Sequence, residues 1–469
     1  MPCLVGIHKE EKDKQIVVDA LARTKVLLSK GAREQAFMVL KNVSHLCLDD
    51  WRIQFELGVR FFQVGSLDRA EWALRNSLAN NFENAQALRY LSSLLYEKGD
   101  RVAADRALQA ASCVDPIITP THHSTDKPTV FRLRSTEKSY QGITWNGALQ
   151  MNEIGLRRGH FSTRALIDRR RVNLYTADFH GDNLIAHADR MTCDLLVNTV
   201  SCPDLKRGPL SEIEQWLKSV PAIPVLNKPE LVLRTTRLEN AQRLGALDGI
   251  LFPKTIKISS SQPFDEILNR LKAENMVYPI MIREAGTQTG KSVFLATSEG
   301  DLANAINSAA SGQSKELYAI QYIDCRDESG YFKKLRAFFI DGTFYPVANL
   351  TSDHWQIHSA DRYRVMDKLE AAQKEERAYL IDPWEYLGAE RMRCLAEVER
   401  VVGLDFFGID FFPHPSGKTV IFEANAAMRH NFDHADNFAY TRPFLEAISN
   451  AFMTMIQQRI SFARRLAAG

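Results

Sequence analysis

The sequence lacks long apolar runs, a strong net charge and a secretory leader. Although 45% of its 469 residues are hydrophobic, no apolar stretch approaches the roughly 18 residues that mark a membrane span, so no contact with a membrane is expected. The N-terminal segment has only a few apolar residues before its acids and lysines, and we do not expect a signal peptide. A formal net charge of +2 gives no field that favours nucleic acid as a partner.

Paired cysteine motifs are also absent. None of the seven cysteines belongs to a Cys-x-x-Cys pair, and they are scattered along the chain at positions 3, 47, 113, 193, 202, 325 and 394. This usage is typical of reduced thiols. The sequence therefore predicts a cytoplasmic protein.

The first part of the chain repeats at an interval of 34 residues. Three small or apolar residue types share this register, and they are Gly31, Gly65 and Gly99, then Ala36, Ala70 and Ala104, then Leu40, Leu74 and Leu108. The period and its helical pattern resemble the tetratricopeptide repeat. Stacked helix pairs form grooves that bind partners, so we expect this region to recruit a substrate or a protein partner. A dimerisation surface, giving a homodimer, and a stabilising cap are the alternatives.

A polar segment around 119–127 reads as a linker, and 119–170 as a whole gives a poor pattern apart from a strand at VFRLRS. From Arg171 to Asn227 short apolar strands alternate with a helix, which favours a small parallel sheet. Polar residues after the first two strands, His180 to Asn183 and then Asn198 and Ser201, lie where open α/β sheets bind ligands. Structural loops would explain them equally well.

The segment YPIMIREAGTQTGKSVFLATS, from Tyr278 to Ser298, reads as strand, glycine loop and strand. It is not a P-loop, because three residues rather than four separate Gly286 from Gly290 and a strand rather than a helix follows. We expect a hairpin loop over phosphate groups, with glycines that permit close backbone approach. The residues that would contact the phosphates are Arg283, Gly286, Thr287, Thr289, Gly290 and Lys291.

Two further stretches suit a nucleotide. ELYAIQYID is an apolar strand with a polar end, and backbone groups of Gln321, Tyr322 and Ile323 are candidates to bind adenine, with Asp324 or Asp327 for the ribose hydroxyls. KKLRAFFIDGTFYPVANL reads as a hairpin that turns at Asp341 and Gly342 and carries Arg336. Arg336 suits a phosphate, but a structural ion pair would explain it equally well.

The stretch from Asp405 to Met428 reads as two strands joined by a turn rich in proline and glycine. Folding this hairpin brings Asp410 close to Glu423, and Asn425 projects from the same face as Glu423 because side chains alternate along a strand. Three oxygen ligands of this kind suit Mg²⁺ whose remaining positions are filled by phosphate oxygens.

In this order, the segments YPIMIREAGTQTGKSV, AIQYID, LRAFFIDG and FFGIDFFPHPSGKTVIFEANAAM resemble the ATP-grasp superfamily. The resemblance covers roughly residues 170 to 455, and it implies that ATP lies between two α+β subdomains. It also implies that Asp410, Glu423 and Asn425 hold Mg²⁺. Arg237 and Arg283 fall where many members have nucleotide-binding lysines, which preserves charge but replaces a point charge with a planar fork.

By this resemblance, we expect a ligase that activates a carboxylate as an acyl phosphate and joins it to an amine. Arg336 would contact the acyl phosphate or the transferred phosphoryl group, and Arg429 would hold an acceptor carboxylate or the tetrahedral intermediate. The substrate would be a small amino-acid-like molecule, a peptide or a protein tail. An ATP-grasp kinase and a non-enzymatic repeat scaffold with a nucleotide-binding domain are the alternatives. His354, His430 and His434 are candidate bases, or surface histidines.

The expected fold is therefore multidomain. We expect an all-α repeat domain over residues 1–118, a linker of uncertain structure over 119–170, an α/β domain that precedes the ATP-grasp domain over 171–227, and an α+β ATP-grasp domain over 228–469.

Overall fold

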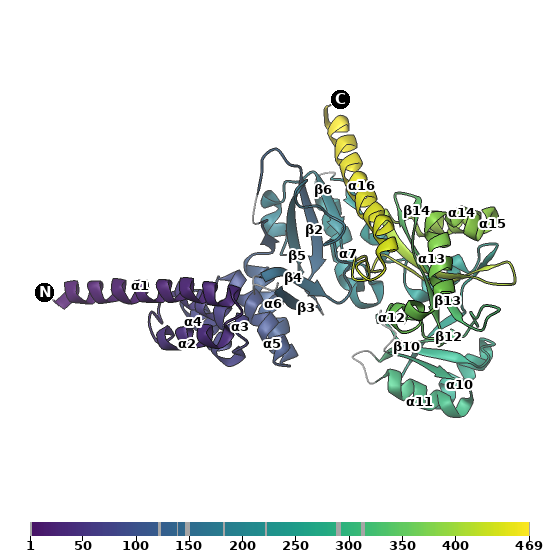
Figure 1. Ribbon diagram of the computed structural model, residues 1–469, viewed down its shortest axis with the longest axis horizontal. Helices are drawn as coiled ribbons and strands as arrows, with labels where there is room; N and C mark the ends of the chain where they lie inside the picture. The colour runs from purple at the N-terminus through teal and green to yellow at the C-terminus, as the bar shows by residue number, and fades with distance from the viewer. Residues whose placement is uncertain are drawn as a thin grey trace. The chain divides into compact units, whose positions relative to one another are not determined.

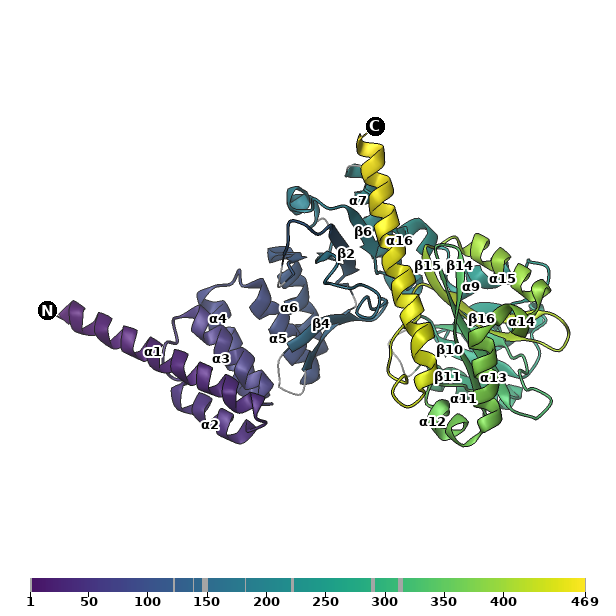
Figure 2. The same ribbon diagram turned by 45° about the horizontal axis from the view of Figure 1, so that its top comes forward.

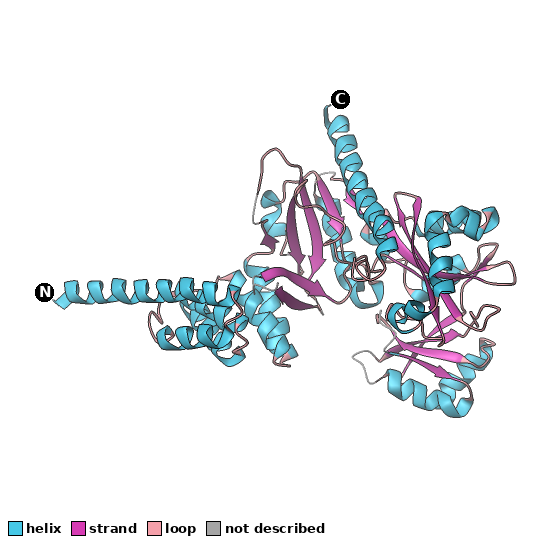
Figure 3. Cartoon of the chain, in the orientation of Figure 1, coloured by secondary structure: helices cyan, strands magenta, loops and turns pink. Residues whose placement is uncertain are grey.

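A computed structural model describes residues 2–120, 123–137, 139–145, 151–181, 183–220, 223–287, 292–310 and 315–468. The chain contains helices and sheets (Figures 1 and 3). It divides into two compact units, the first formed by Met1–Pro120, Leu133–Arg158 and Tyr175–Met191, and the second by Thr121–Arg132, Gly159–Leu174 and Thr192–Gly469.

The first unit begins with helices that repeat at the interval expected from the sequence. They are α1 (Pro2–Ser29), α2 (Arg33–Val43), α3 (Trp51–Gln63), α4 (Leu67–Asn80), α5 (Ala85–Glu97) and α6 (Arg101–Val114). The starts of α3 and α5, and those of α4 and α6, are each 34 residues apart. Gly31, Gly65 and Gly99 end the first helix of successive pairs with φ of 75°, 85° and 89°, a left-handed backbone that glycine adopts without steric cost.

Repeated small residues allow the helices to approach closely. The repeating alanines and leucines, Ala36, Ala70, Ala104, Leu40, Leu74 and Leu108, are all buried. Gly58 on α3 faces Leu74 on α4, and a Cβ at position 58 would lie 2.7 Å from Leu74 Cγ. The sequence period is therefore the packing period of this helix array.

Strands complete the first unit. β1 (Ile117–Ile118) pairs antiparallel with β5 (Asn173–Phe179), and β3 (Tyr140–Trp145) pairs antiparallel with β4 (Met151–Arg157). A 3₁₀ helix, η1, spans Ile185–Arg190. The region 119–170, expected to be a linker, contains β2 (Thr129–Ser135), β3 and β4. The strand predicted at VFRLRS is therefore confirmed, whereas the domain boundaries stay predictions.

From Thr192 on, the second unit contains elements of the expected α/β type. β6 (Leu195–Asn198) and β7 (Val225–Leu226) pair in parallel through Leu196↔Val225, and α7 (Pro203–Ser219) connects them. The short helices α8 (Pro229–Val232) and α9 (Arg237–Leu244) follow.

Next comes an antiparallel sheet in the order β11-β10-β12-β9. Its strands are β9 (Thr255–Ser259), β10 (Ile280–Glu284), β11 (Val293–Ala296) and β12 (Glu316–Gln321), and the helices α10 (Phe264–Ala273) and α11 (Glu299–Ala309) pack on it through a buried aliphatic core. β10 and β11 pair antiparallel through Ile280↔Ala296. The predicted strand after the glycine loop is thus confirmed, and the P-loop reading stays excluded.

The other sheet of this unit has the order β14-β13-β15-β16-β8. Its strands are β8 (Ile250–Leu251), β13 (Phe332–Ile340), β14 (Thr343–Ser352), β15 (Phe406–Pro413) and β16 (Thr419–Asn425). The remaining helices are α12 (Asp361–Arg364), η3 (Met366–Lys368), α13 (Glu370–Ile381), α14 (Pro383–Leu387), α15 (Ala389–Val402), η4 (Ala439–Thr441) and α16 (Arg442–Ala468). None of the helices in the described part of the chain is both long and apolar enough to cross a bilayer.

One face of this sheet is divided between an apolar end and a charged end. At the apolar end, Phe338 stacks on Phe406 with ring centroids 5.0 Å apart, and Phe452 of α16 meets Phe406 edge-on at 5.1 Å. α16 runs along the sheet in both views (Figures 1 and 2). Because side chains alternate along a strand, Arg336 and Asp410 project from this same face, beyond the part that α16 covers.

Candidate functional site

Three charged residues form a row across neighbouring strands. Arg336 on β13 is the ladder partner of Asp410 on β15, and Asp410 is the ladder partner of Glu423 on β16. Asn425 pairs with Gly408 one step along the same face. The predicted convergence of Asp410 and Glu423 is therefore present in the fold, and its cause is the antiparallel register of the hairpin.

A β-bulge lies next to this row. Asp410 pairs with Glu423 but the next residue, Phe411, pairs with Ile421, which leaves Phe422 as the extra residue. The Phe422 carbonyl accepts a hydrogen bond from Arg237 Nη1 at 2.8 Å. Bulges free backbone groups and redirect side chains near sites, and here the bulge brings the Arg237 guanidinium to the strand that carries Glu423.

Asp410 is held by two cations. Arg336 donates from Nε and Nη2 to the two carboxylate oxygens at 2.7 and 2.9 Å, and Lys334 Nζ lies 3.3 Å from Oδ2. Asp410 is only 4% exposed. Burial alone would raise the pKa of Asp410, but the charges of Arg336 and Lys334 outweigh it and hold the pKa well below its usual value.

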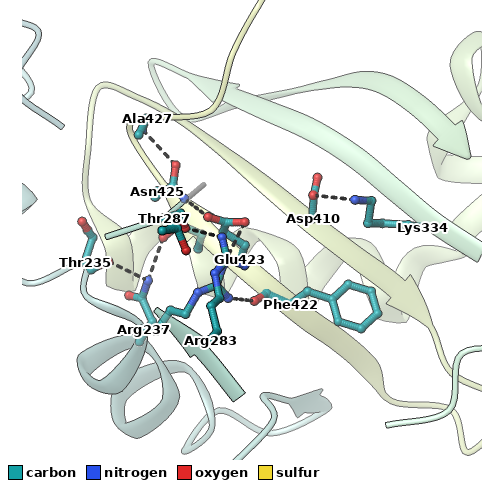
Figure 4. Close-up of polar contacts among 12 residues, drawn as sticks. Thr235, Arg237, Arg283, Thr287, Lys334, Asp410, Phe422, Glu423, Asn425 and Ala427 are labelled. Carbon is teal, nitrogen blue, oxygen red and sulfur yellow. Dashed lines mark hydrogen bonds and ion pairs between the residues drawn. The ribbon is translucent and has the colours of Figure 1, made fainter. Parts of the chain in front are cut away.

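Glu423 has its own set of partners (Figure 4). Arg237 Nη2 lies 3.0 Å from Oε2, and Asn425 Nδ2 donates to Oε1. Asn425 Oδ1 in turn accepts from the Ala427 backbone N–H at 2.9 Å. Burial would raise the pKa of Glu423, but the guanidinium groups of Arg237 and Arg283 overcome it and lower the pKa.

The start of α9 fixes the position of Arg237. Thr236 is the N-cap, and a capping box joins its side chain and backbone to Glu239. Arg237 is therefore the first residue of the helix. One turn on, Asn240 Nδ2 donates to the Ala424 carbonyl at 2.7 Å, which ties the helix to β16.

Arg283 on β10 also enters this region. Its Nη2 donates to the Thr287 carbonyl, and burial, followed by the nearby charge of Arg237, lowers its pKa to about 10. Gly286 has φ of +78°, and a Cβ there would lie 2.5 Å from Leu205 Cγ. Thr287 Oγ1 donates to the Glu284 carbonyl at 2.7 Å. Three other predicted loop residues, Thr289, Gly290 and Lys291, lie outside the described residues.

A solvent-connected cleft joins several of these groups. Its walls come from the N-terminus of α7, the start of α9, β10 with the glycine loop, β12 and the end of β16, and they include Arg237, Arg283, Gly286, Thr287, Glu423 and Asn425. Among the described residues, the predicted phosphate-binding and metal-binding groups therefore share one cleft, except for Asp410 and Arg336, which lie on the adjoining strands.

The structure adds cleft residues that sequence reasoning missed. Tyr318 on β12 donates to Asp204 Oδ1 at 2.5 Å, and both residues line the cleft. Burial raises the pKa of Asp204, although the Tyr318 hydrogen bond opposes the shift. Cys202 is also there, and burial raises the pKa of its thiol to about 11. No sequence pattern indicates that α7 packs against β12, so no signal pointed to Asp204 and Tyr318. Lys334 had a signal, because it lies two residues from Arg336 and side chains alternate along a strand.

The residues predicted to bind the base and ribose do not line this cleft. The backbone N–H groups of Gln321 and Tyr322 donate to the carbonyls of Lys254 at 2.8 Å and Pro279 at 3.2 Å. The Asp324 carboxylate pairs with Arg326. Ile323 lies between Tyr322 and Asp324. Their proposed roles stay predictions.

Arg429 lies apart from Arg336. Its side chain is 67% exposed and pairs with Asp433 at 2.9 Å. Among the histidines, His354 is exposed, His434 Nδ1 lies 3.0 Å from the Tyr363 hydroxyl, and His430 is 4% exposed with Nε2 3.0 Å from Ser449 Oγ. The structure does not bring Arg429 to the charged row, and its role also stays a prediction.

Within the described residues no group of three or more His, Cys, Asp and Glu side chains is placed to hold a metal ion. The predicted set contains two carboxylates and one amide. Asp410 and Glu423 are neighbours across the ladder and offer hard oxygen donors, so the chemistry of this set suits Mg²⁺.

No family model matches the chain, and no curated protein matches it. Solved structures that match include the D-alanine–D-alanine ligase from Bacillus anthracis complexed with ATP, at 13% identity over 71% of this chain and 98% of that chain with a TM-score of 0.40. VanG D-Ala:D-Ser ligase from Enterococcus faecalis matches at 12% identity over 70% and 99%, also with a TM-score of 0.40. The ATP-grasp ligase PsnB, complexed with a precursor variant, Mg and ADP, matches at 15% identity over 56% and 78%, with a TM-score of 0.34. At these TM-scores the likenesses carry no conclusion about this chain.

Proposed function

We propose that the second unit is an ATP-grasp-type ligase that uses Mg²⁺ and ATP to join a carboxylate to an amine. The row of Arg336, Asp410 and Glu423 across three strands carries this proposal. It places two carboxylates beside a cleft that also presents Arg237 and Arg283. The order of sequence motifs that resembles the superfamily supports the same reading.

The charges suit a polyphosphate bound with a divalent cation. Arg237 and Arg283 present permanent positive charge to the cleft, and guanidinium groups bind phosphate oxygens in a forked geometry. Asp410, Glu423 and Asn425 would hold Mg²⁺. The ion would neutralise charge on the phosphates during transfer.

The reaction that we propose has two steps. A carboxylate oxygen of the substrate attacks the γ-phosphorus of ATP, ADP leaves, and an acyl phosphate forms. An amine then attacks the carbonyl carbon, inorganic phosphate leaves, and the amine loses a proton. Positioning and electrostatic stabilisation supply most of the catalysis in such transfers. We assign Arg336 to the transferred phosphoryl group, and we keep Arg429 as a candidate for the acceptor.

We propose that the helix array of the first unit is a tetratricopeptide-type domain. The 34-residue offsets of the helices and the left-handed glycines that end their first members support this reading. Such an array would recruit the substrate or a protein partner, and dimerisation is the alternative. A cytoplasmic location stays a prediction from the scattered thiols.

An ADP-release screen of the full chain with Mg²⁺-ATP against amino acids and peptides tests the proposal. Hydroxylamine in the mixture traps an acyl phosphate as a hydroxamate. We expect ADP release and a hydroxamate with a carboxylate substrate. ADP release without hydroxamate would instead indicate a kinase that acts on a hydroxyl group. Absence of nucleotide binding would contradict the proposed function.

A further inference from the structure

The two carboxylates proposed as metal ligands already carry cationic partners within the protein. Asp410 accepts both arms of the Arg336 fork at 2.7 and 2.9 Å, and Glu423 lies 3.0 Å from Arg237 Nη2. A cation that approached Asp410 would have to displace a bidentate, buried ion pair. The metal would then compensate the Asp410 charge, but the Arg336 guanidinium would lose its partner unless an anion replaced the carboxylate.

The cations around the two carboxylates disfavour a metal ion alone. Asp410 and Glu423 are surrounded by four cationic side chains, which are Arg237, Arg283, Lys334 and Arg336. A bare divalent cation would therefore approach carboxylates that already have cationic partners. A cation that arrives with a polyphosphate brings anionic oxygens to which the guanidinium groups can turn.

We propose that the carboxylates in and beside this cleft exchange their ion-pair partners when metal and nucleotide bind. Without nucleotide, Arg336 and Arg237 occupy the carboxylates of Asp410 and Glu423. When metal and polyphosphate bind, the two carboxylates bind the metal instead, and the two guanidinium groups bind the phosphate oxygens. This inference rests on the proposed function, since it describes how the side chains of the same site change partners on binding.

The surroundings of Arg336 allow such a change without unfolding the strand. The Tyr379 hydroxyl donates to the Arg336 carbonyl at 3.0 Å, which anchors its backbone. The Arg336 side chain is 29% exposed while that of Asp410 is 6% exposed. The guanidinium can therefore turn toward the open side while the carboxylate stays in place. A ladder irregularity between Arg336 and Ala337 lies at the same point of β13.

Ion-pair exchange predicts that a single variant changes nucleotide affinity in opposite directions with and without metal. Asp410→Asn removes a proposed metal ligand, so binding of AMP-PNP with Mg²⁺ should weaken. The same change releases Arg336, so binding of AMP-PNP in EDTA should tighten, by about 5- to 150-fold, the usual range of coupling. Titration calorimetry on the full chain measures both. Equal weakening in both conditions would contradict the inference.

A double variant separates release of Arg336 from a general gain of positive charge. If Asp410→Asn acts by freeing Arg336, its gain in EDTA should disappear when Arg336→Met is added, because neighbouring residues that share an interaction are not additive. A gain that persists in the double variant would contradict the inference. Asp341→Asn is the matched control, because it removes the same charge at the β13–β14 turn, where Asp341 pairs with Arg459. It should change neither affinity.

A metal titration without nucleotide tests whether Arg336 hinders metal binding at Asp410. Mn²⁺ titration followed by electron paramagnetic resonance should show weak binding to the wild-type chain, and Arg336→Met should bind Mn²⁺ at least about tenfold more tightly. Arg283→Met removes an equal charge from the adjoining cleft, but Arg283 bonds to the Thr287 carbonyl rather than to a carboxylate. Its gain should be smaller. Equal gains in both variants, or none, would contradict the inference.

The outcomes distinguish this inference from the proposed function. If the wild-type chain binds no AMP-PNP with Mg²⁺, the proposed function fails, and the Mn²⁺ titration still decides whether Arg336 blocks Asp410. If AMP-PNP binds but the double variant is additive, the exchange fails while the proposed function stands. Should Asp410→Asn not fold, Glu423→Gln gives the same test through Arg237.

Discussion

Arg336 and Asp410 are ladder partners on β13 and β15, and their side chains form a bidentate ion pair at 2.7 and 2.9 Å. The strand register and the side-chain chemistry therefore coincide at one point of the sheet. Glu423 continues the row on the next strand. This arrangement makes the site a property of one local hairpin, β15 and β16, and of β13, which is distant from the hairpin in sequence.

Removing both carboxylates should abolish turnover. We expect Asp410→Asn combined with Glu423→Gln to eliminate Mg²⁺-dependent ADP release, because no carboxylate would remain in the proposed metal set. The control is the helix content of the variant, measured by circular dichroism, since the repeats lie in the other unit and should stay folded. A variant that releases ADP at the native rate would show that the metal site is wrong.

Replacing Arg283 should weaken nucleotide binding. Its side chain is partly buried, and its pKa, lowered to about 10, leaves it charged at neutral pH. We expect Arg283→Met to weaken AMP-PNP binding with Mg²⁺ by about tenfold or more, the loss that charge-assisted hydrogen bonds predict. Calorimetry measures the change, and Arg270→Met, an exposed position on α10, is the control. An unchanged affinity would remove Arg283 from the phosphate site.

His430 should make stability depend on mild acid. It is buried against Phe338 and Phe432, its Nδ1 has no hydrogen-bond partner among the described residues, and burial lowers its pKa to about 4. His430 binds a proton near pH 6.5 in the unfolded chain, but only near pH 4 in the folded chain. Stability should therefore fall as the pH drops through this window, by roughly 3 kcal/mol in total.

The comparison that checks this uses His430→Phe. Its melting temperature should change less between pH 7 and pH 4.5 than that of the wild type, because the group that titrates is gone. His45→Phe, at an exposed position, should keep the wild-type profile. Parallel profiles for wild type and His430→Phe would show that another group dominates.

Gly408 should tolerate no side chain. A Cβ there would lie 2.4 Å from Met428 Sδ and 2.8 Å from Met428 Cβ. We expect Gly408→Ala to destabilise the second unit by about 1–3 kcal/mol through overpacking, seen as a lower melting temperature. Gly300→Ala on α11, whose nearest neighbour would be 3.7 Å away, should be neutral or stabilising. Equal melting temperatures for the two variants would contradict this packing.

The repeat region should fold by itself. Its core runs from Val17 to Ala107 and lies within the helices, so a fragment of residues 1–116 is expected to give a helical circular dichroism spectrum. The fragment lacks Asp178, which pairs with the buried side chain of Arg89 at 3.8 Å. We therefore expect it to melt below the full chain. A random-coil spectrum would contradict the domain boundary.

Much of the site could be predicted because its parts are local. Glu423 and Asn425 are two residues apart on one strand, and the turn at 413–417 determines which residues of the hairpin face each other. The roles assigned to Gln321, Tyr322 and Ile323 show the limit of such reasoning. Whether their backbone groups are open to a ligand depends on strands that pair with them, and Lys254 and Pro279 already accept from two of them.

The sequence by itself determined the 34-residue helix period, the hairpin with Asp410 opposite Glu423, and the strand after the glycine loop. Each follows from side-chain periodicity and turn chemistry within a few tens of residues. Only the tertiary structure decided that Arg336 occupies Asp410, that Arg237 reaches the Phe422 carbonyl, and that Tyr318 binds Asp204. These contacts depend on strand register, a β-bulge and the packing of α7, which join distant segments through burial rather than through local preference.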